Sequence, residues 1–123
     1  MAELSSDIMR GYHDVIVLSV LAEGDSYGYE ISRRIYERSG GRYPIKETTL
    51  YSTFTRLERG GYIRAYVGTE TFGRQRTYYN MTAAGRRYLA QKCEECRLVK
   101  EVIDAFIDGM DLPENRMDSN RKD

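Results

Sequence analysis

The chain has 123 residues, of which 41% are hydrophobic and 31% are charged, and its formal net charge is zero. A chain of this length forms one domain with one modest core. It contains no run of about 18 apolar residues, so the sequence predicts no transmembrane helix. The acidic, polar N-terminus shows no secretory signal, and two cysteines without such a signal indicate a reducing, cytoplasmic location.

The neutral total hides an uneven distribution of charge along the chain. Residues 1–32 carry one basic side chain against six acidic ones, whereas residues 33–80 carry ten against four. Most basic side chains of this middle segment are arginines, which make planar, bidentate contacts to phosphates and guanine edges. A basic run is often only a solvated face, so the segment indicates nucleic acid only in a suitable fold.

The first predicted element is a helix over residues 5–22, which contains the apolar segment Val15–Leu21. Residues upstream of and within this segment recur at spacings of four, three and four, which favours a helix over a strand: Ile8, Tyr12, Val15 and Ser19. A helix that is apolar all round has to be covered on two faces. We therefore expect something besides the core of its own domain to cover part of it.

Two further helices are predicted over residues 27–39 and 47–59. Ser26 is placed to cap the first of them, and Gly40-Gly41 ends it. The second helix has a core stripe at i, i+4 and i+7, namely Leu50, Phe54 and Leu57. Its opposite face is polar and rich in hydroxyl groups, and it lacks the alternating Glu/Lys pattern of a plainly solvated helix.

The C-terminal half predicts a hairpin followed by a long helix. The segments 62–67 and 76–81 are β-branched and aromatic, and the loop between them carries arginine. We expect Thr82 to cap the last helix, which runs to residue 110 and carries a heptad seam: Leu89, Lys92, Cys96, Val99, Ile103, Phe106 and Met110. A small domain cannot cover so long a seam, so we expect the same helix of a second subunit to pair with it.

The predicted order α-α-α-β-β-α defines a mainly α (α+β) fold, a winged helix-turn-helix with a long C-terminal dimerisation helix. We expect the winged helix-turn-helix over residues 1–81, with residues 5–22 also at the dimer interface, the dimerisation helix over 82–110 and a disordered tail over 111–123. The third helix of such a fold enters the major groove, and the hairpin contacts neighbouring phosphates. The predicted partners are a palindromic double-stranded DNA operator and a second copy of the chain.

Five sequence blocks, in order, closely resemble the PadR family of bacterial transcriptional regulators: Leu21–Ile31, Glu47–Tyr51, Arg56–Ile63, Gly73–Tyr79 and Thr82–Gly85. The resemblance spans most of the chain, and the length matches the short branch of the family, which has one C-terminal helix. It implies a homodimeric winged-helix protein, usually a repressor. Short-branch relatives often respond to hydrophobic, aromatic or drug-like compounds, so a ligand of that class is a candidate effector.

The candidate DNA contacts come from the start of the second helix, the third helix and the hairpin: Tyr27, Lys46, Thr48, Thr49, Tyr51, Ser52, Thr55, Arg56, Arg74 and Arg76. Two positions depart from the family pattern, because Lys46 replaces a small capping residue and Ser52 replaces a frequent proline. A cation at a helix N-terminus is unfavourable unless an anion lies nearby. A DNA phosphate would be such an anion, and plain solvent exposure is the alternative.

The resemblance also implies an effector site at the dimer interface, between the first and last helices. The matching positions are Ile8, Gly11, Tyr12, Val15, Ser19, Lys92, Cys96, Val99, Lys100 and Ile103. Drug-sensing relatives carry an aromatic side chain near the position of Cys96, which this chain lacks, with Tyr12 and Phe106 as the candidate substitutes. The alternative is a plain dimer core formed with the other seam residues, Leu89, Phe106 and Met110.

Cys93 and Cys96 form a C-x-x-C pair on one face of the last predicted helix. Two ligands do not complete a zinc site, so we expect buried structural cysteines, with thiol or redox sensing as the alternative. His13 has no accompanying nucleophile, second base or phosphate loop, so we expect a helix-packing or exposed histidine and no enzyme, metal site or cofactor. A winged-helix module that contacts proteins instead of an operator remains a further alternative.

Overall fold

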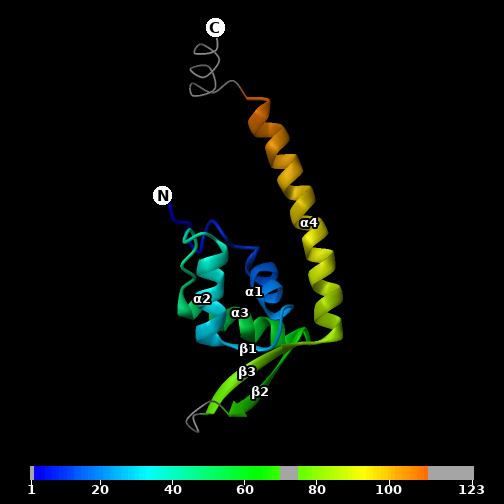
Figure 1. The fold of residues 1–123 in the computed structure, drawn as a ribbon. Helices are drawn as coiled ribbons and strands as arrows, with labels where there is room; N and C mark the ends of the chain where they lie inside the picture. The colour runs from blue at the N-terminus through cyan, green and yellow to red at the C-terminus, as the bar shows by residue number, and fades with distance from the viewer. Residues whose placement is uncertain (1, 70–74, 111–123) are drawn as a thin grey trace. The chain divides into compact units, whose positions relative to one another are not determined.

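The structure, a computed structural model, describes residues 2–69 and 75–110 (Figure 1). Its elements are α1 (His13–Leu21), β1 (Ser26–Tyr27), α2 (Gly28–Arg38), α3 (Glu47–Arg59), β2 (Ile63–Thr69), β3 (Gln75–Met81) and α4 (Ala83–Asp108). Three helices, an antiparallel hairpin and a long last helix confirm the predicted winged helix-turn-helix class. The chain forms two compact units, residues 1–93 and residues 94–123.

The first helix is shorter than predicted. The prediction began at residue 5, whereas α1 begins at His13 and residues 6–11 form turns. Gly11 has a φ of 92°, a left-handed backbone conformation that residues other than glycine rarely adopt. It separates these turns from the helix. Ile8 therefore stays outside α1 and is 63% exposed.

A short strand, β1, occupies the position where a helix cap was expected. Ser26 and Tyr27 pair with Tyr79 and Tyr78 of β3, and Tyr27 is the residue at the N-cap of α2. The buried Ser26 hydroxyl donates a hydrogen bond to the Glu30 carboxylate instead of capping the backbone. The prediction of Ser26 as the cap is wrong, because pairing with β3 places this residue in a sheet.

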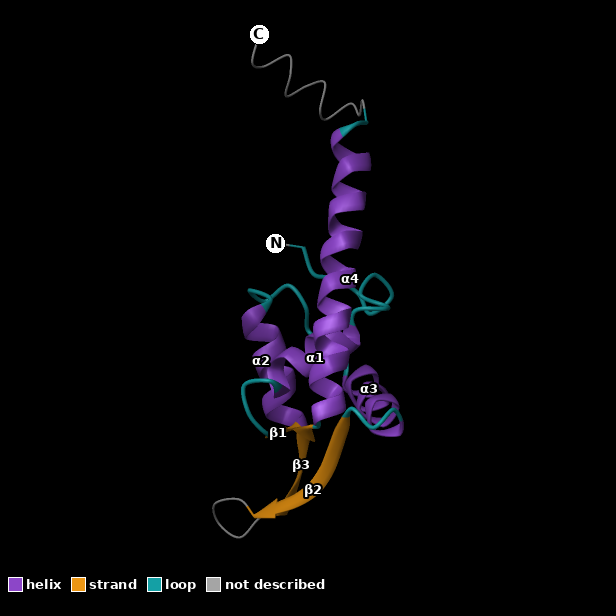
Figure 2. Ribbon diagram, turned by 90° about the vertical axis from the view of Figure 1, so that its right-hand side faces the viewer, coloured by secondary structure: helices purple, strands orange, loops and turns teal. Residues whose placement is uncertain are grey.

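The three strands form one antiparallel sheet in the order β1-β3-β2. The hairpin register runs from Ile63 opposite Met81 to Thr69 opposite Gln75, so both strands extend further toward the loop than predicted. In Figure 2 the hairpin of β2 and β3 extends away from α1, α2 and α3. Residues 70–74 of its loop, including the predicted DNA contact Arg74, lie outside the described residues.

One core joins α1, α2, α3 and the sheet. The predicted stripe of α3 is confirmed, since Leu50, Phe54 and Leu57 are each no more than 2% exposed. Phe54 stacks on Tyr79 of β3 with ring centroids 4.1 Å apart, which fixes α3 against the sheet. The remaining core residues are Val17, Leu18, Val20, Leu21, Ile31, Ile35, Tyr43, Ile63 and Met81.

The last helix starts as the sequence predicts. The Gly85 backbone N–H donates to Thr82 Oγ1 at 3.0 Å, so Thr82 caps α4. Tyr88 in its second turn stacks on Tyr62, with centroids 4.0 Å apart. Among the described helices, none is long and apolar enough to cross a membrane.

The second unit consists of the rest of α4 and the residues that follow it. Apolar side chains recur along it at intervals of three and four residues, and each is between 42% and 70% exposed: Leu98, Val99, Val102, Ile103, Phe106, Ile107 and Met110. This stripe is wider than the predicted seam, which omitted Leu98, Val102 and Ile107. A stripe of this width is typical of a helix that packs against other helices.

Candidate nucleic-acid interface

The solvent-exposed face of α3 carries most of the predicted contacts. Lys46, Thr48, Tyr51, Ser52 and Thr55 are all exposed. The hydroxyls of Ser52 and Thr55 donate to backbone carbonyls one turn earlier, at 3.0 and 3.1 Å. These bonds fix the two side chains on the helix surface and leave the hydroxyl oxygens able to accept hydrogen bonds.

Thr49 is the predicted α3 residue that contacts the segment before α1. It is half-buried, and its hydroxyl lies 3.3 Å from the hydroxyl of Ser6, in the segment that precedes α1. The backbone carbonyl of Thr49 accepts hydrogen bonds from both Ser52 and Thr53. Thr49 therefore connects the N-terminal segment to the exposed face of α3.

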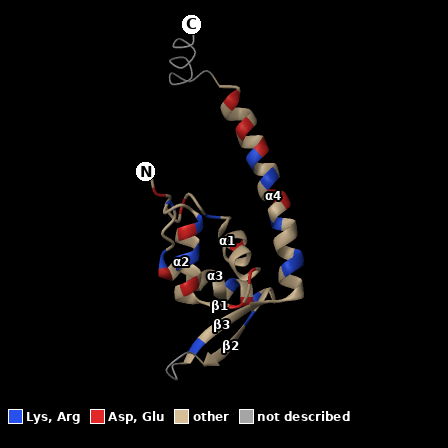
Figure 3. Cartoon of the chain, viewed as in Figure 1, with Lys and Arg blue, Asp and Glu red and all other residues tan. Residues whose placement is uncertain are grey.

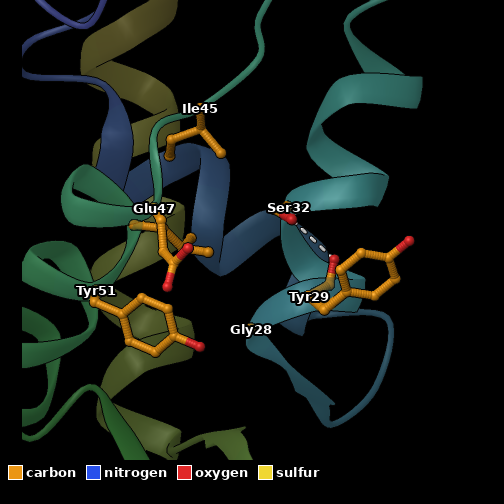
Figure 4. A pocket seen from close by; sticks show the side chains of 7 residues that line it. Gly28, Tyr29, Ser32, Ile45, Glu47 and Tyr51 are labelled. Carbon is orange, nitrogen blue, oxygen red and sulfur yellow. Dashed lines mark hydrogen bonds between the residues drawn. The ribbon is translucent and has the colours of Figure 1, made fainter.

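Tyr51 packs over the start of α2 instead of extending freely into solvent. A Cβ atom added at Gly28 would lie 2.2 Å from the Tyr51 hydroxyl oxygen, so glycine leaves the space that this side chain occupies. The tyrosine ring also meets Phe54 edge-on, at 5.2 Å between centroids. A pocket of about 320 Å³ opens between α2 and α3, and Figure 4 shows Tyr51 and Tyr29 in its lining.

Arg76 on β3 is half-buried against the start of α2. Its guanidinium carbon lies 4.4 Å from the centroid of the Tyr27 ring, a cation–π contact. The Nε atom of Arg76 is buried and has no hydrogen-bond partner among the described residues. The two predicted contacts Tyr27 and Arg76 therefore lie together, at a second pocket of about 270 Å³ that Tyr51 also lines.

Arg56 is turned toward α1. Its guanidinium pairs with Asp14, whose side chain is 15% exposed and which also accepts a hydrogen bond from the Tyr88 hydroxyl at 2.7 Å. Burial and this hydrogen bond raise the pKa of Tyr88 to about 12. Asp14 thus links α1 to α3 and to the first turns of α4, and it neutralises part of the charge of Arg56.

One carboxylate connects the hairpin of β2 and β3 to the turn between α1 and β1. Asn80 and Tyr66 donate side-chain hydrogen bonds to Asp25 at 2.8 and 2.7 Å. These two bonds hold the pKa of the Asp25 carboxyl below its ordinary value. Asp25 therefore joins both strands of the hairpin to the helical part of the domain.

The basic middle segment is partly neutralised within the fold. Figure 3 shows basic residues on α2, on α3 and in the hairpin. On α2, Arg33 pairs with Glu37, while Arg34 and Arg38 pair with Glu23. Between α2 and the end of β2, the cations that form no ion pair with other described residues are Arg42, Lys46, Arg59 and Arg64.

Two exposed residues near the hairpin and α2 were not among the contacts predicted from the sequence. Arg64 on β2 is exposed, and Tyr29 at the start of α2 is 69% exposed and lines both pockets near Tyr51. Arg64 lies within the basic segment of residues 33–80 that the sequence indicated. The available signal for Tyr29 was an aromatic residue at the start of a predicted helix. A tyrosine that stays in solvent gains no stability from burial, so an exposed tyrosine at such a position is a candidate contact.

The residues predicted for the effector site are divided between the two units. In the first unit Ile8 and Gly11 are exposed, and Tyr12, Val15, Ser19 and Lys92 are half-buried. In the second unit Cys96 is half-buried, whereas Val99, Lys100 and Ile103 are exposed. Cys93 and Cys96 are free thiols and are half-buried instead of fully buried.

His13 has a packing role. Its Nε2 atom lies 2.6 Å from the Tyr43 hydroxyl in the core, and burial together with the charge of Arg56 lowers the pKa of the imidazole. Asp14 acts in the opposite direction on that pKa. Within residues 2–69 and 75–110, no group of three or more His, Cys, Asp or Glu side chains is placed to hold a metal ion.

The fold and the polar exposed face of α3 define a winged helix-turn-helix protein. Residues 17–91 match the family described as the transcriptional regulator PadR-like family, so the chain belongs to that family. It is 45% identical to an uncharacterized protein from Lysinibacillus sphaericus over 106 residues, which cover 86% of this chain and 97% of that protein.

Solved structures agree with this assignment. A transcriptional regulator from Clostridium thermocellum is 57% identical, with a TM-score of 0.77 over 85% of this chain and 98% of that one. A PadR family transcription regulator from Clostridium difficile is 36% identical, with a TM-score of 0.68 over 79% and 99% of the two chains. Bacillus subtilis PadR, solved in complex with operator DNA, shares the fold at 21% identity, with a TM-score of 0.59 over 67% and 45%.

Proposed function

We propose that this chain is a sequence-specific DNA-binding transcriptional regulator that acts as a homodimeric repressor. The observation that carries the proposal is the exposed face of α3, where hydroxyl, tyrosine and lysine side chains lie opposite the core stripe. Hydroxyl side chains hydrogen-bond to bases and phosphates, and cations neutralise phosphates. Membership of the PadR-like family and the operator complex of Bacillus subtilis PadR support it.

In this proposal α3 enters the major groove, and the start of α2 and the hairpin contact the flanking phosphates. The proposed contact residues are Tyr27, Lys46, Thr48, Thr49, Tyr51, Ser52, Thr55, Arg56, Arg74 and Arg76. The neighbours of these residues indicate which of them should contribute most to the salt dependence of binding. Lys46 forms no ion pair with the other described residues, whereas Arg56 is partly neutralised by Asp14, so we expect Lys46 to contribute more to the salt dependence of binding.

Dimerisation is proposed through α4. Apolar residues scattered singly on a surface are ordinary, but residues 98–110 form a continuous exposed apolar stripe. A second copy of the helix would cover it. The proposed interface residues are Leu89, Cys96, Val99, Ile103, Phe106 and Met110. Because a two-fold dimer presents two copies of α3, its operator is palindromic.

Release of the dimer from DNA is proposed to follow binding of a small hydrophobic or aromatic effector at the dimer interface. The proposed lining comes from α1, from the residues just before α1, and from α4: Ile8, Gly11, Tyr12, Val15, Ser19, Lys92, Cys96, Val99, Lys100 and Ile103. The apolar side chains in this set offer burial to a planar ligand, and Tyr12 offers an aromatic surface. Oxidation of Cys93 and Cys96 is a separate route to release that the same binding assay would detect.

The test is fluorescence anisotropy of a labelled duplex from the region upstream of the gene, compared with a scrambled duplex of the same composition. At physiological salt, specific regulators prefer their site by roughly 10³-fold or more. We expect such a preference, with an affinity that falls steeply as salt increases. Weak and equal binding to both duplexes, and to fragments selected from the whole genome, would instead indicate a module that contacts proteins.

Substitutions of Lys46, just before α3, and of Arg74 in the hairpin loop test the phosphate contacts, with a matched control on α2. Lys46→Ala should weaken binding to both duplexes. It should also reduce the slope of log affinity against log salt concentration by about one, the value for one lost phosphate contact. Arg33→Ala removes the same charge from α2, where Glu37 already pairs with it, and should leave the affinity nearly unchanged. Arg74→Ala should behave like Lys46→Ala, and an unchanged salt dependence would exclude a phosphate contact at that position.

The dimer has its own test. Phe106→Asp places a charge in the proposed interface, and sedimentation velocity should show the mass falling from two chains to one. The unfolding transition of residues 1–93 should persist, because Phe106 is 70% exposed and contributes nothing to that core. A wild-type chain that sediments as a monomer at micromolar concentration would overturn this part of the proposal.

A further inference from the structure

An apolar cavity of about 260 Å³, open to solvent on one side, lies in the first unit between α1, α2 and the segment that precedes α1. Aliphatic and thioether side chains form its walls: Leu4, Met9, Ile16, Val20 and Ile35. Its remaining lining residues are Ser19, Arg38, Ser39 and Tyr43. Only Ser19 belongs also to the effector site proposed at the dimer interface, so most of the lining of this cavity is distinct from that site.

The polar side chains around the cavity are already engaged within the chain. The Ser19 and Ser39 hydroxyls donate to backbone carbonyls at 2.8 and 2.9 Å. The Tyr43 hydroxyl shares a hydrogen bond with His13, and Arg38 is ion-paired. Because these groups are already paired within the chain, an apolar ligand gains burial in the cavity without leaving any of them unsatisfied.

The size of the cavity limits the ligand further. A dry apolar cavity of about 150 Å³ already accommodates benzene, so 260 Å³ accommodates a molecule of two fused rings. We propose that this cavity is a binding site for a small, uncharged, apolar molecule of about that size. Binding would be driven by removal of apolar surface from water, without a directional polar anchor.

The segment before α1 connects the cavity to the exposed face of α3. Leu4, one wall of the cavity, donates its backbone N–H to the Arg42 carbonyl at 2.8 Å. Two residues later, the Ser6 hydroxyl meets the Thr49 hydroxyl of α3 at 3.3 Å. A ligand that contacts Leu4 and Met9 therefore touches a segment that also contacts α3, and we expect it to lower the affinity for operator DNA. This last step rests on the proposed function.

Indole is the probe for the test, because the chain contains no tryptophan and tyrosine emission can be avoided by excitation at the red edge of indole absorption. Titration of the full chain, without DNA, should shift indole emission to shorter wavelength with a saturable Kd below about 1 mM. In ¹⁵N–¹H spectra of the wild-type chain, the largest shifts should fall on amides of the cavity walls, such as Ile16, Val20 and Ile35.

Two matched substitutions locate the site. Ile16→Phe fills the cavity and should raise the indole Kd at least tenfold. Ile45→Phe makes the same change at a half-buried residue that lines the pocket between α2 and α3, and should leave the Kd unchanged. If Ile16→Phe does not fold, the spectra of the wild-type chain still decide the location.

The outcomes separate this proposal from the proposed function. Saturable binding with shifts at the cavity walls supports the site, whether or not the chain binds DNA. Absence of saturable binding, or shifts confined to residues 94–110, overturns it. If indole binds in the cavity and operator affinity stays unchanged at saturating indole, the coupling through Ser6 and Thr49 is wrong while the site stands.

Discussion

Replacement of Asp14 by alanine should destabilise the first unit more than any other single change to an exposed or half-buried polar residue described above. Asp14 accepts hydrogen bonds from two charged or polar partners on different helices, Arg56 and Tyr88. Alanine removes both acceptors at once. The expected loss follows from the exposure of each partner.

The Arg56 contribution is small, because its side chain is 56% exposed and water replaces the lost partner. An ion pair of that kind is worth about 0.5–1 kcal/mol. The Tyr88 hydroxyl is half-buried and donates to a charged acceptor at 2.7 Å, a bond worth about 1.5–3 kcal/mol. Asp14→Ala should therefore lower the free energy of unfolding by about 2–4 kcal/mol.

Urea denaturation at one fixed protein concentration measures this loss, since the stability of the proposed dimer would depend on concentration. Tyr88→Phe should cost about 1.5–3 kcal/mol and Arg56→Ala less than about 1 kcal/mol. The double variant Asp14→Ala/Tyr88→Phe should cost little more than Asp14→Ala alone, because both changes remove the same bond. An Asp14→Ala cost below about 1 kcal/mol, or an Arg56→Ala cost larger than that of Tyr88→Phe, would refute this reasoning.

Three further predictions concern single residues. Gly28→Ala should leave α2 folded, since Ala favours helices, but should displace the Tyr51 side chain and weaken operator binding in the anisotropy assay, whereas unchanged affinity would show that Tyr51 makes no contact. His13 has a lowered pKa in the folded state, so the unfolded chain binds its proton first as pH falls below about 6.5. Stability should therefore decline on acidification, and less steeply in His13→Gln, as urea midpoints across pH would show. Tyr88 has a pKa raised to about 12, so stability should fall as pH rises from 10 toward 12, and Tyr88→Phe should remove part of that fall.

Much of the fold was predictable because it depends on short-range patterns. The apolar spacing of Leu50, Phe54 and Leu57 placed α3 with its correct ends, and Thr82 marked the start of α4. Local conformation explains the error in the first helix, and pairing with a distant strand explains the error at Ser26. Gly11 adopts a left-handed φ that no periodicity reveals, and β1 exists only because β3 lies beside it.

The candidate site was predictable as a set of residue types on one helix face, but the state of each side chain was not. The sequence determined which residues of α3 face outward, since their spacing on a helix follows from its 3.6-residue turn. It could not determine that Arg56 pairs with Asp14 or that Arg76 lies on Tyr27, since those partners are 42 and 49 residues away along the chain.

The sequence by itself therefore determined the class of fold, the family and the outward face of α3. Only the tertiary structure decided which cations are left without an internal partner, and it alone formed the apolar cavity between α1, α2 and the N-terminal segment. The reason is physical. Helix periodicity and capping act over a few neighbouring residues, whereas ion pairs and cavities arise when distant segments meet and their unfilled volume and unpaired charges become defined.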